Sequence, residues 1–354
     1  MIQQYVATKR EAIRAELHTF LQHSASWMAN VNEFGPEVAG LLDEFSSAGK
    51  MVRGALVAFG AELCGATPHR CHLQAGAVLE LVQSFLLIHD DIMDRDATRR
   101  GKPSVYYGYV QRAREERISD PEHYGTSLGI CIGDVAMLLA VELISELELD
   151  AELRVRLVRL LSREIAQVGL AQMQDVEQGI AGERANAAAV LRLYRYKTGR
   201  YTFSLPLMTG AIIAGREAET VEKLGALGEE LGVIFQIKDD QLGLFGSSET
   251  IGKPVGSDIK ADKKTLFRLY LFTNASDADR RRLAAVFGSP ELTGRDLSFV
   301  RDCLRRYRVL EQVQAELDEL KRSCERMIAG LTELTPEARE RLTAVLEYNL
   351  NRDR

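Results

Sequence analysis

Two pairs of adjacent aspartates, each placed after an apolar stretch, are the residues of this sequence best suited to chemistry. The first cluster, Asp90 to Asp94 with the sequence DDIMD, follows the apolar run from Phe85 to Ile88. On a helix, Asp90 and Asp94 lie one turn apart on the same face, about 6 Å along the axis, so their carboxylates repel unless a cation lies between them. Such oxygen ligands suit Mg²⁺, which completes its shell with water and substrate phosphates. An ordinary solvated helix end has the same spacing, and a single cluster leaves both interpretations open.

A second cluster favours the metal-binding interpretation. Asp239 and Asp240 again follow apolar residues, and Gln236 precedes Asp240 by one helical turn. Lysines and arginines lie in loops or interrupted segments around the two clusters; each alone is typical of a solvated surface, but together they could hold anionic oxygens. The pattern indicates a pocket for one or two diphosphates. The basic residues concerned are Lys50, Arg53, Arg99, Arg100, Lys197, Lys253, Lys263 and Lys264.

Helices must position these side chains. Apolar residues recur every three or four positions along most of the chain, for example at Val78, Leu81, Phe85 and Ile88. Strand-like alternation is hard to find, only 8 prolines occur in 354 residues, and neither a linker nor a repeat divides the sequence. We therefore expect an all-α protein, with residues 1–354 forming a single domain, one large helical bundle. The clearest expected loops are 99–104, 117–121 and 245–256, and residues 269–354 indicate charged amphipathic helices, for example 301–327, in an outer layer.

Composition and simple motifs exclude several classes of protein. With 45 Lys and Arg against 51 Asp and Glu, the net charge of −6 argues against nonspecific nucleic-acid binding. No uninterrupted apolar span of about 18 residues and no secretory signal is apparent, so we expect a cytoplasmic protein without stable membrane insertion. The five cysteines form no CxxC pair. The stretch from Gly246 to Lys253 is one residue too long for a phosphate-binding P-loop, and Pro254 stands where Ser or Thr must bind the metal.

The segments around both clusters resemble the trans-isoprenyl diphosphate synthase family, all-helical enzymes that elongate allylic diphosphates with isopentenyl diphosphate. Residues 79–94, with Thr98 to Gly101, are similar nearly residue for residue to the family's first aspartate-rich region, and residues 235–240 to its second. Shorter elements agree in order: GKxxR at 49–53, GD at 133–134, QxxD at 172–175, YKT at 196–198, GKP at 252–254 and GSD at 256–258. The resemblance extends over residues 45–268. It implies a type I isoprenoid synthase fold, a helical bundle around a central cavity, and a homodimer.

The same resemblance implies a role for each site residue. Three Mg²⁺ ions per active site would be held from two opposite walls, by Asp90, Asp91 and Asp94 on one and by Asp239 and Asp240 on the other. The allylic diphosphate would contact Arg99, Lys197 and Lys253. Isopentenyl diphosphate would be held by Lys50, Arg53, Gln83 and Arg100, so that the two adjacent arginines serve different substrates. Thr198 and Gln236 would line the reacting centre, and Lys263 belongs to the substrate-binding set.

Such a pocket makes the allylic diphosphate a good leaving group and stabilises its departure toward an allylic carbocation, which the double bond of isopentenyl diphosphate attacks. The growing chain is expected to run back along the helix that carries Asp90, where Leu86 lies one turn below, about 6 Å, with Phe85 beside it. A medium aliphatic residue and a bulky aromatic indicate intermediate depth, which favours geranylgeranyl diphosphate (C20) with farnesyl diphosphate (C15) as the alternative. Phe85 also fits the apolar stripe, so a purely structural role stays open.

One departure from the family pattern keeps two other functions in view. Gly243 stands where most members carry the third aspartate of the second region, so that position contributes no charge. A class I terpene cyclase shares the first motif, but it would not need a second set of basic residues. A noncatalytic partner subunit of a prenyl synthase usually loses its aspartates, whereas Asp90, Asp91 and Asp94 are all present here. His89 is expected to support or pack beside Asp90 rather than to bind metal.

Overall fold

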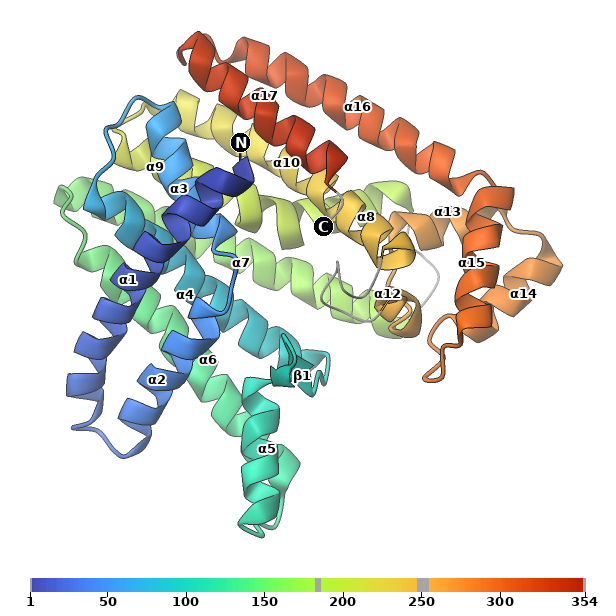
Figure 1. The fold of residues 1–354 in the computed structure, drawn as a ribbon, viewed down its shortest axis with the longest axis horizontal. Coiled ribbons are helices and arrows are strands. Elements are labelled where there is room, and N and C mark those ends of the chain that lie inside the picture. Colours follow the sequence, from blue (N-terminus) through green and yellow to red (C-terminus); the bar gives the residue numbers. More distant parts are fainter. Residues whose placement is uncertain (1, 182–185, 247–254, 353–354) are drawn as a thin grey trace. The chain divides into compact units, whose positions relative to one another are not determined.

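The computed structural model describes residues 2–181, 186–246 and 255–352. Apart from one two-stranded hairpin, the regular secondary structure of these residues is helical, which confirms the all-α prediction (Figure 1). The first half contains α1 (Ile2–Met28), α2 (Phe34–Ser47), α3 (Val52–Leu63), α4 (Arg70–Met93), β1 (Thr98–Arg99), β2 (Lys102–Pro103), α5 (Val105–Glu115), α6 (Pro121–Ser145) and α7 (Ala151–Ala181). The second half contains α8 (Ala187–Leu193), the π-helix η1 (Tyr194–Ser204), α9 (Leu205–Ile213), α10 (Ala218–Phe245), α12 (Ser257–Lys260), α13 (Leu266–Asn274), α14 (Asp277–Val286), α15 (Gly294–Arg306), α16 (Val309–Gly330) and α17 (Pro336–Asn351).

The chain forms two compact units. Unit 1 comprises residues 1–160 and 206–216, and unit 2 comprises residues 161–205 and 217–354. Helices α7 and α9 therefore contribute residues to both units. The expectation of a single domain stays a prediction, and each unit is described by itself.

Glycines set the packing of unit 1 around α4. Helices α3 and α4 cross where Gly54 meets Gly76, so closely that a Cβ on either residue would lie 2.9 Å from the carbonyl oxygen of the other. Gly133 of α6 gives the same kind of space to the ring of His89, whose Nε2 donates to the carbonyl oxygen of Ile130 at 3.2 Å. Because small residues let the backbones approach, the apolar face of α4 is buried over most of its length, and its acidic end is held in place.

The expected loop at residues 99–104 contains the antiparallel hairpin β1–β2, with Arg99 opposite Lys102. Arg100 and Gly101 form its turn, and both have positive φ, 53° and 77°. A two-residue turn of this kind matches the right-handed twist of the strands. Gly101 adopts this conformation freely, whereas Arg100 does so against the steric preference of its side chain.

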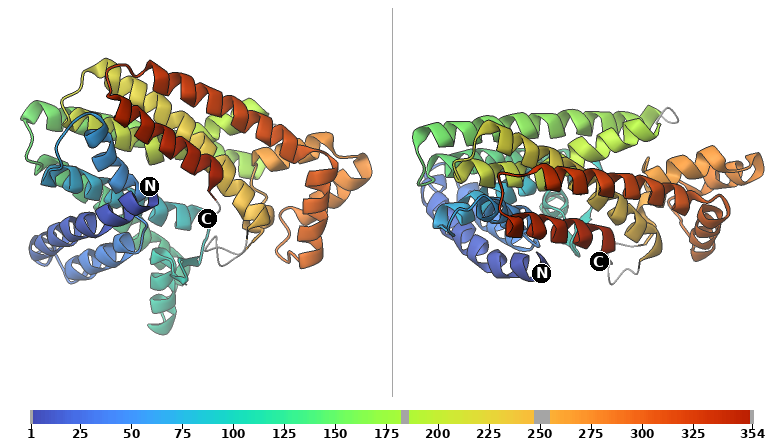
Figure 2. Two further views of the ribbon diagram at one scale, coloured as in Figure 1. Left: turned by 45° about the horizontal axis from the view of Figure 1, so that its top comes forward. Right: turned by 90° about the horizontal axis from the view of Figure 1, so that it is seen from above.

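In unit 2, α10 packs along η1, and α16 and α17 run along α10 (Figure 2). The closest approach is at Gly232 of α10, where a Cβ would lie 2.2 Å from the Cα of Gly199 in η1. This contact brings Thr198 beside Gln236, one turn along α10 from Gly232.

The C-terminal region is helical, but the stretch 301–327 that we expected as an example of one amphipathic helix is two. Helix α15 ends at Arg306 and α16 begins at Val309, with Arg308 in the left-handed region at φ 54°. Amphipathic spacing continues on both sides of such a break, so periodicity alone does not reveal it.

Two of the described helices, α4 and α6, are long and apolar enough to cross a membrane. The most apolar window of α4 is 67% buried within the fold, and that of α6 is 44% buried. Core helices of globular proteins meet the same criterion, so this is weak evidence for a span.

Candidate active site

The acidic end of α4 presents two carboxylates toward its surroundings and buries a third. Asp90 is half-buried, and Asp94 is exposed at the C-cap, where its N–H donates to the Asp90 carbonyl oxygen at 2.8 Å. Within the described residues the Asp90 carboxylate has no hydrogen-bond or ion-pair partner. A carboxylate at a helix C-terminus is also disfavoured by the helix dipole. Asp90 is therefore available to a cation.

Asp91 is turned the other way. Its side chain is 0% exposed, and its Oδ1 accepts from the Arg99 Nε at 2.8 Å and from the same guanidinium's second nitrogen. Burial raises the pKa of Asp91, and the ion pair with Arg99 opposes that rise. In this geometry Asp91 holds Arg99 beside the end of α4; a role as metal ligand stays a prediction.

The second arginine of the hairpin points elsewhere. Arg100 donates to the carbonyl oxygen of Phe45 at 2.9 Å, and its Nη2 lies 3.3 Å from the place a Cβ on Gly49 would take. Lys50 and Arg53 follow at the start of α3, where Met51 has a positive φ of 53°. The turn thus separates the adjacent arginines, one toward Asp91 and one toward the 49–53 loop.

A buried acid that the sequence did not single out supports this basic group. Glu80 of α4 is 2% exposed, and its Oε1 accepts from the backbone N–H of Gly54 at 2.9 Å, in the first turn of α3. Burial raises the pKa of Glu80, and the Gly54 hydrogen bond and the charges of Arg53 and Arg100 oppose that rise. Glu80 therefore caps α3 from the neighbouring helix, and its ionised form has a charge opposite to that of the arginines.

The remaining α4 residues of the predicted site lie between Glu80 and Asp90. Gln83, Phe85 and Leu86 are all half-buried, and the ring of Phe85 packs edge-on against His89 with centroids 4.8 Å apart. Phe85 and Leu86 are thus accessible enough to contact a chain lying along α4. The packing of His89 agrees with its expected supporting position.

In unit 2 the π-helix η1 and α10 bring the second set of residues together. Lys197 Nζ pairs with the Asp175 carboxylate of α7 at 2.5 Å. Thr198 Oγ1 donates to Gln236 Oε1 at 2.9 Å, and Gln236 Nε2 donates to Asp240 Oδ1 at 2.8 Å. The predicted Thr198, Gln236 and Asp240 are therefore linked in one hydrogen-bonded series.

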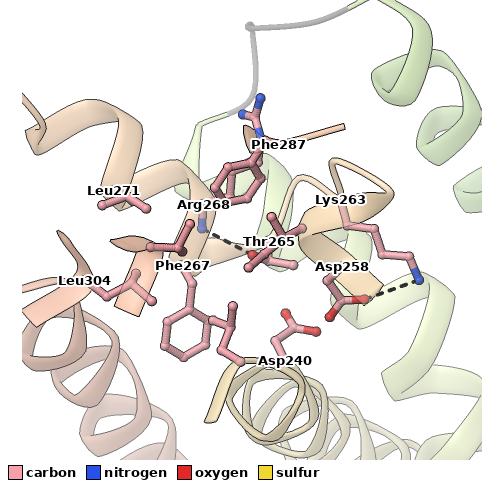
Figure 3. A pocket seen from close by; sticks show the side chains of 12 residues that line it. Asp240, Asp258, Lys263, Thr265, Phe267, Arg268, Leu271, Phe287 and Leu304 are labelled. Atoms are coloured by element: carbon pink, nitrogen blue, oxygen red, sulfur yellow. Dashed lines mark hydrogen bonds and ion pairs between the residues drawn. The ribbon is translucent and has the colours of Figure 1, made fainter. Parts of the chain in front are cut away.

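Asp240 is buried, with 4% of its surface exposed, and its second oxygen accepts from the Tyr194 hydroxyl. Burial, together with the nearby charge of Asp258, raises the pKa of Asp240 to about 8, while the Tyr194 and Gln236 donors oppose that rise. Asp240 and Asp258 turn their carboxylates to the same small cavity, and Lys263 pairs with Asp258 at 3.7 Å (Figure 3). This cavity of about 10 Å³ holds at most one water, so it is no site for a diphosphate.

Asp239 is exposed to solvent and forms an ion pair with Arg352. Its side chain is half exposed, and its Oδ1 lies 3.4 Å from Nη2 of Arg352. The guanidinium of Arg352 also stacks on the Phe235 ring, 3.9 Å from its centroid. Arg352 was not among the predicted site residues.

The donors fit a hard divalent cation. Within the described residues no three Asp, Glu, His or Cys side chains converge as a ready-made metal group. Asp90, Asp94 and Asp239 are nevertheless accessible carboxylates, the ligand type of magnesium, which commonly takes only one or two of them beside water and phosphate. Of the predicted site residues, Lys253 lies outside the described residues.

A family model described as polyprenyl synthetase matches residues 37–302, well over half of the chain. The chain belongs to the polyprenyl synthetase family. It is a trans-prenyltransferase, a synthase of prenyl diphosphates. The resemblance found in the sequence is thereby confirmed.

The sequences of several relatives can be aligned with most of this synthase. The geranylgeranyl diphosphate synthase of Saccharolobus solfataricus is 27% identical over 86% of this chain and 85% of the relative. The short chain isoprenyl diphosphate synthase of Methanocaldococcus jannaschii is 31% identical over 64% of this chain, and the match spans 63% of that relative's length. A geranylgeranyl pyrophosphate synthase of Corynebacterium glutamicum, solved with isoprenyl diphosphate and magnesium, is 27% identical with a TM-score of 0.88 over 97% of this chain and 98% of that one. The type I isoprenoid synthase fold is confirmed by this likeness.

Proposed function

We propose that this synthase condenses isopentenyl diphosphate with allylic diphosphates in a magnesium-dependent reaction and releases geranylgeranyl diphosphate. The end of α4 carries the proposal: Asp90 is accessible and without a partner among the described residues, beside an arginine that Asp91 holds in place. A relative of similar structure over nearly its whole length was solved with isoprenyl diphosphate and magnesium.

The two sets of basic residues divide the substrates. Arg99 and Lys197, each oriented by a carboxylate, would bind the allylic diphosphate, and Lys253 would join them. Lys50, Arg53 and Arg100 with Gln83 would bind isopentenyl diphosphate. This division is supported by the hairpin turn, which points Arg99 and Arg100 to different places.

Asp90 and Asp94 from unit 1 and Asp239 from unit 2 would hold the metal ions, three in all. Magnesium, when bound, neutralises the diphosphate and makes it a better leaving group. Asp91 and Asp240 would position the neighbouring site residues rather than bind metal directly, because their oxygens already accept hydrogen bonds from Arg99, Gln236 and Tyr194. Arg352 would have to leave Asp239 before a cation binds there.

The hydrocarbon end of the substrate would run along α4 past Leu86 and Phe85. Both are half-buried, one turn or slightly more before Asp90, so they would limit chain growth to C20. Farnesyl diphosphate, C15, is the alternative product.

We further propose a cytoplasmic homodimer formed through the outer face of α6. Ile130 and Leu138 on this helix are 44% and 68% exposed, which leaves apolar surface for a second copy of the chain.

Incubation of the purified protein with labelled isopentenyl diphosphate, Mg²⁺ and dimethylallyl, geranyl or farnesyl diphosphate tests the proposal. We expect elongation from each primer and a C20 product on chromatography after dephosphorylation. Product stopping at C15 would favour a farnesyl diphosphate synthase. Cyclised hydrocarbon, or no turnover without a second protein, would favour the terpene cyclase or the noncatalytic subunit and overturn the proposal.

A further inference from the structure

Tyr194 has a buried hydroxyl group, and the directions of its hydrogen bonds are fixed when its partner Asp240 is ionised. Tyr194 opens η1, and its side chain is buried within unit 2. The backbone N–H of Leu266 lies 3.1 Å from the hydroxyl oxygen and can only donate to it. When Asp240 is ionised, the single phenolic proton is therefore given to its Oδ2, the other partner of the hydroxyl.

The direction of the Tyr194 hydrogen bond also determines the direction of the next hydrogen bond, between Asp240 and Gln236. With the Tyr194 proton on Oδ2, the Oδ1 atom accepts from Gln236, so the amide nitrogen of Gln236 must face Asp240. The amide oxygen is then the end that faces Thr198, and the Thr198 hydroxyl donates to it at 2.9 Å. A glutamine amide can be turned over without steric cost, and here its partners leave one orientation.

The consequence falls on the oxygen of Thr198. Because the Thr198 hydroxyl donates its proton to Gln236, its oxygen can act only as an acceptor, through its lone pairs, toward any other group. Thr198 follows Lys197, which lies in an ion pair with Asp175. An oxygen presenting lone pairs stabilises positive charge developing nearby, whereas a hydroxyl proton in that direction would oppose it.

Asp240 depends on Tyr194 for this arrangement. Its carboxylate is buried and lies near the like charges of Asp258 and Asp239. Removing the Tyr194 hydroxyl leaves Oδ2 without its donor, and a buried acceptor then turns to the nearest remaining one. That donor is the Gln236 amide, which would be drawn away from Thr198.

We propose that Tyr194 is a positioning residue for prenyl transfer, which fixes the Thr198 hydroxyl as an acceptor through Asp240 and Gln236. The inference rests on the proposed function, because it takes the developing allylic cation as the group that Thr198 meets. All four residues belong to unit 2.

The test is Tyr194→Phe, with Tyr270→Phe as the matched control. The Tyr270 hydroxyl also donates a hydrogen bond to a half-buried carboxylate, that of Glu316 at 2.7 Å. Both residues belong to unit 2 but lie outside the hydrogen-bonded series of Tyr194. We expect kcat to fall about 10- to 100-fold in Tyr194→Phe with KM for both substrates within about threefold, and both parameters to stay within about twofold in Tyr270→Phe. Equal effects of the two variants, or a change confined to KM, would overturn the proposal.

A double-mutant cycle separates positioning from general stabilisation. If Tyr194 acts through Thr198, then Tyr194→Phe has little further effect on kcat in a Thr198→Val background. Full multiplication of the two single losses would contradict the proposal. Should Tyr194→Phe fold poorly by circular dichroism, Gln236→Leu interrupts the same series at its next link, and the same non-additivity with Thr198→Val is expected.

Crystal structures of the wild type and Tyr194→Phe give a readout that does not depend on activity. The Gln236 side chain is expected to leave Thr198 in the variant, and an unchanged contact would overturn the inference. A wild type that does not elongate would refute the proposed function, while these structures would still decide the role of Tyr194.

Discussion

Gly243 marks the residue-scale difference between this chain and the usual second aspartate region. A Cβ at this position would lie 3.1 Å from Oδ2 of Asp258, a residue 15 positions further along the chain. The glycine thus leaves space that the Asp258 carboxylate approaches. Asp258 supplies a negative charge close to the place where a third aspartate would have put one.

Restoring that aspartate should therefore harm the protein when no metal is bound. Gly243→Asp adds a carboxylate beside Asp240 and Asp258, and we expect it to lower the free energy of unfolding by about 1–3 kcal/mol relative to Gly243→Ala in the presence of EDTA. Thermal unfolding with EDTA and with Mg²⁺ measures this, and Mg²⁺ should return part of the loss. Equal stability of the two variants in EDTA would show that the added charge does not meet Asp258.

Asp90 is the residue whose removal should matter most for turnover. Asp90→Ala deletes an accessible carboxylate that has no other partner among the described residues, and we expect elongation to fall at least about 1,000-fold at any Mg²⁺ concentration tested. Asp43→Ala is the control, because it also removes one negative charge from unit 1 but its carboxylate pairs with His18. Substantial elongation by Asp90→Ala would place the metal elsewhere.

At the scale of elements, the sequence predicted which helices carry the candidate site residues, but it did not predict the contacts that hold the side chains of those residues. Apolar spacing predicted the helices that became α4 and α10; the first aspartate cluster lies in the last turn of α4, and the second lies in the last but one turn of α10. The hairpin β1–β2 was expected as a loop, because its strands are two residues long and its turn depends on a left-handed arginine. Helix periodicity likewise did not reveal the break at Arg308.

Glu80, Tyr194 and Arg352 were missed for a common physical reason. Their partners Gly54, Asp240 and Asp239 lie 26, 46 and 113 positions away in the chain. A carboxylate, a phenol or a guanidinium that finds its partner only through tertiary packing leaves no local pattern. The nearest available signal was a charged residue, Glu80, in an otherwise apolar helical stretch.

The capping of α3 by Glu80 gives the stability of the protein a pH dependence. Because burial raises the pKa of Glu80 above 4.5, the folded protein retains a proton that the unfolded chain loses, and stability falls as pH rises above that value. Glu80→Gln keeps an acceptor for the Gly54 N–H but does not titrate. We expect wild type to lose stability relative to Glu80→Gln as the pH rises above 4.5 in urea unfolding; parallel pH profiles would contradict this.

Helix α4 also offers a test of product length. Phe85→Ala and Leu86→Ala shorten side chains one turn or slightly more before Asp90, and we expect at least one of them to yield products longer than the wild type's. Chromatography of dephosphorylated products from farnesyl diphosphate measures this. An unchanged product length in both variants would show that these residues belong to the packing of α4 alone.

For the whole molecule, the sequence predicted the family and the all-α class, while the candidate site residues and the single domain stay predictions. Each unit carries one part of the predicted site: the end of α4 with its arginines in unit 1, and η1 with α10 in unit 2. Catalysis as proposed needs both parts on one substrate. Because the net charge is −6, the chain as a whole does not attract an anionic substrate. The substrate must therefore be held by local lysines and arginines and by metal.

The most direct measurement is a crystal structure of the protein with Mg²⁺, isopentenyl diphosphate and a non-reacting thio analogue of an allylic diphosphate. The account predicts metal ions on the analogue's diphosphate, bound by Asp90 and Asp94 from one side and by Asp239 from the other, with Arg352 displaced. Isopentenyl diphosphate should lie on Lys50, Arg53 and Arg100. A diphosphate bound elsewhere, or ions that leave Asp90 and Asp239 in solvent, would contradict it.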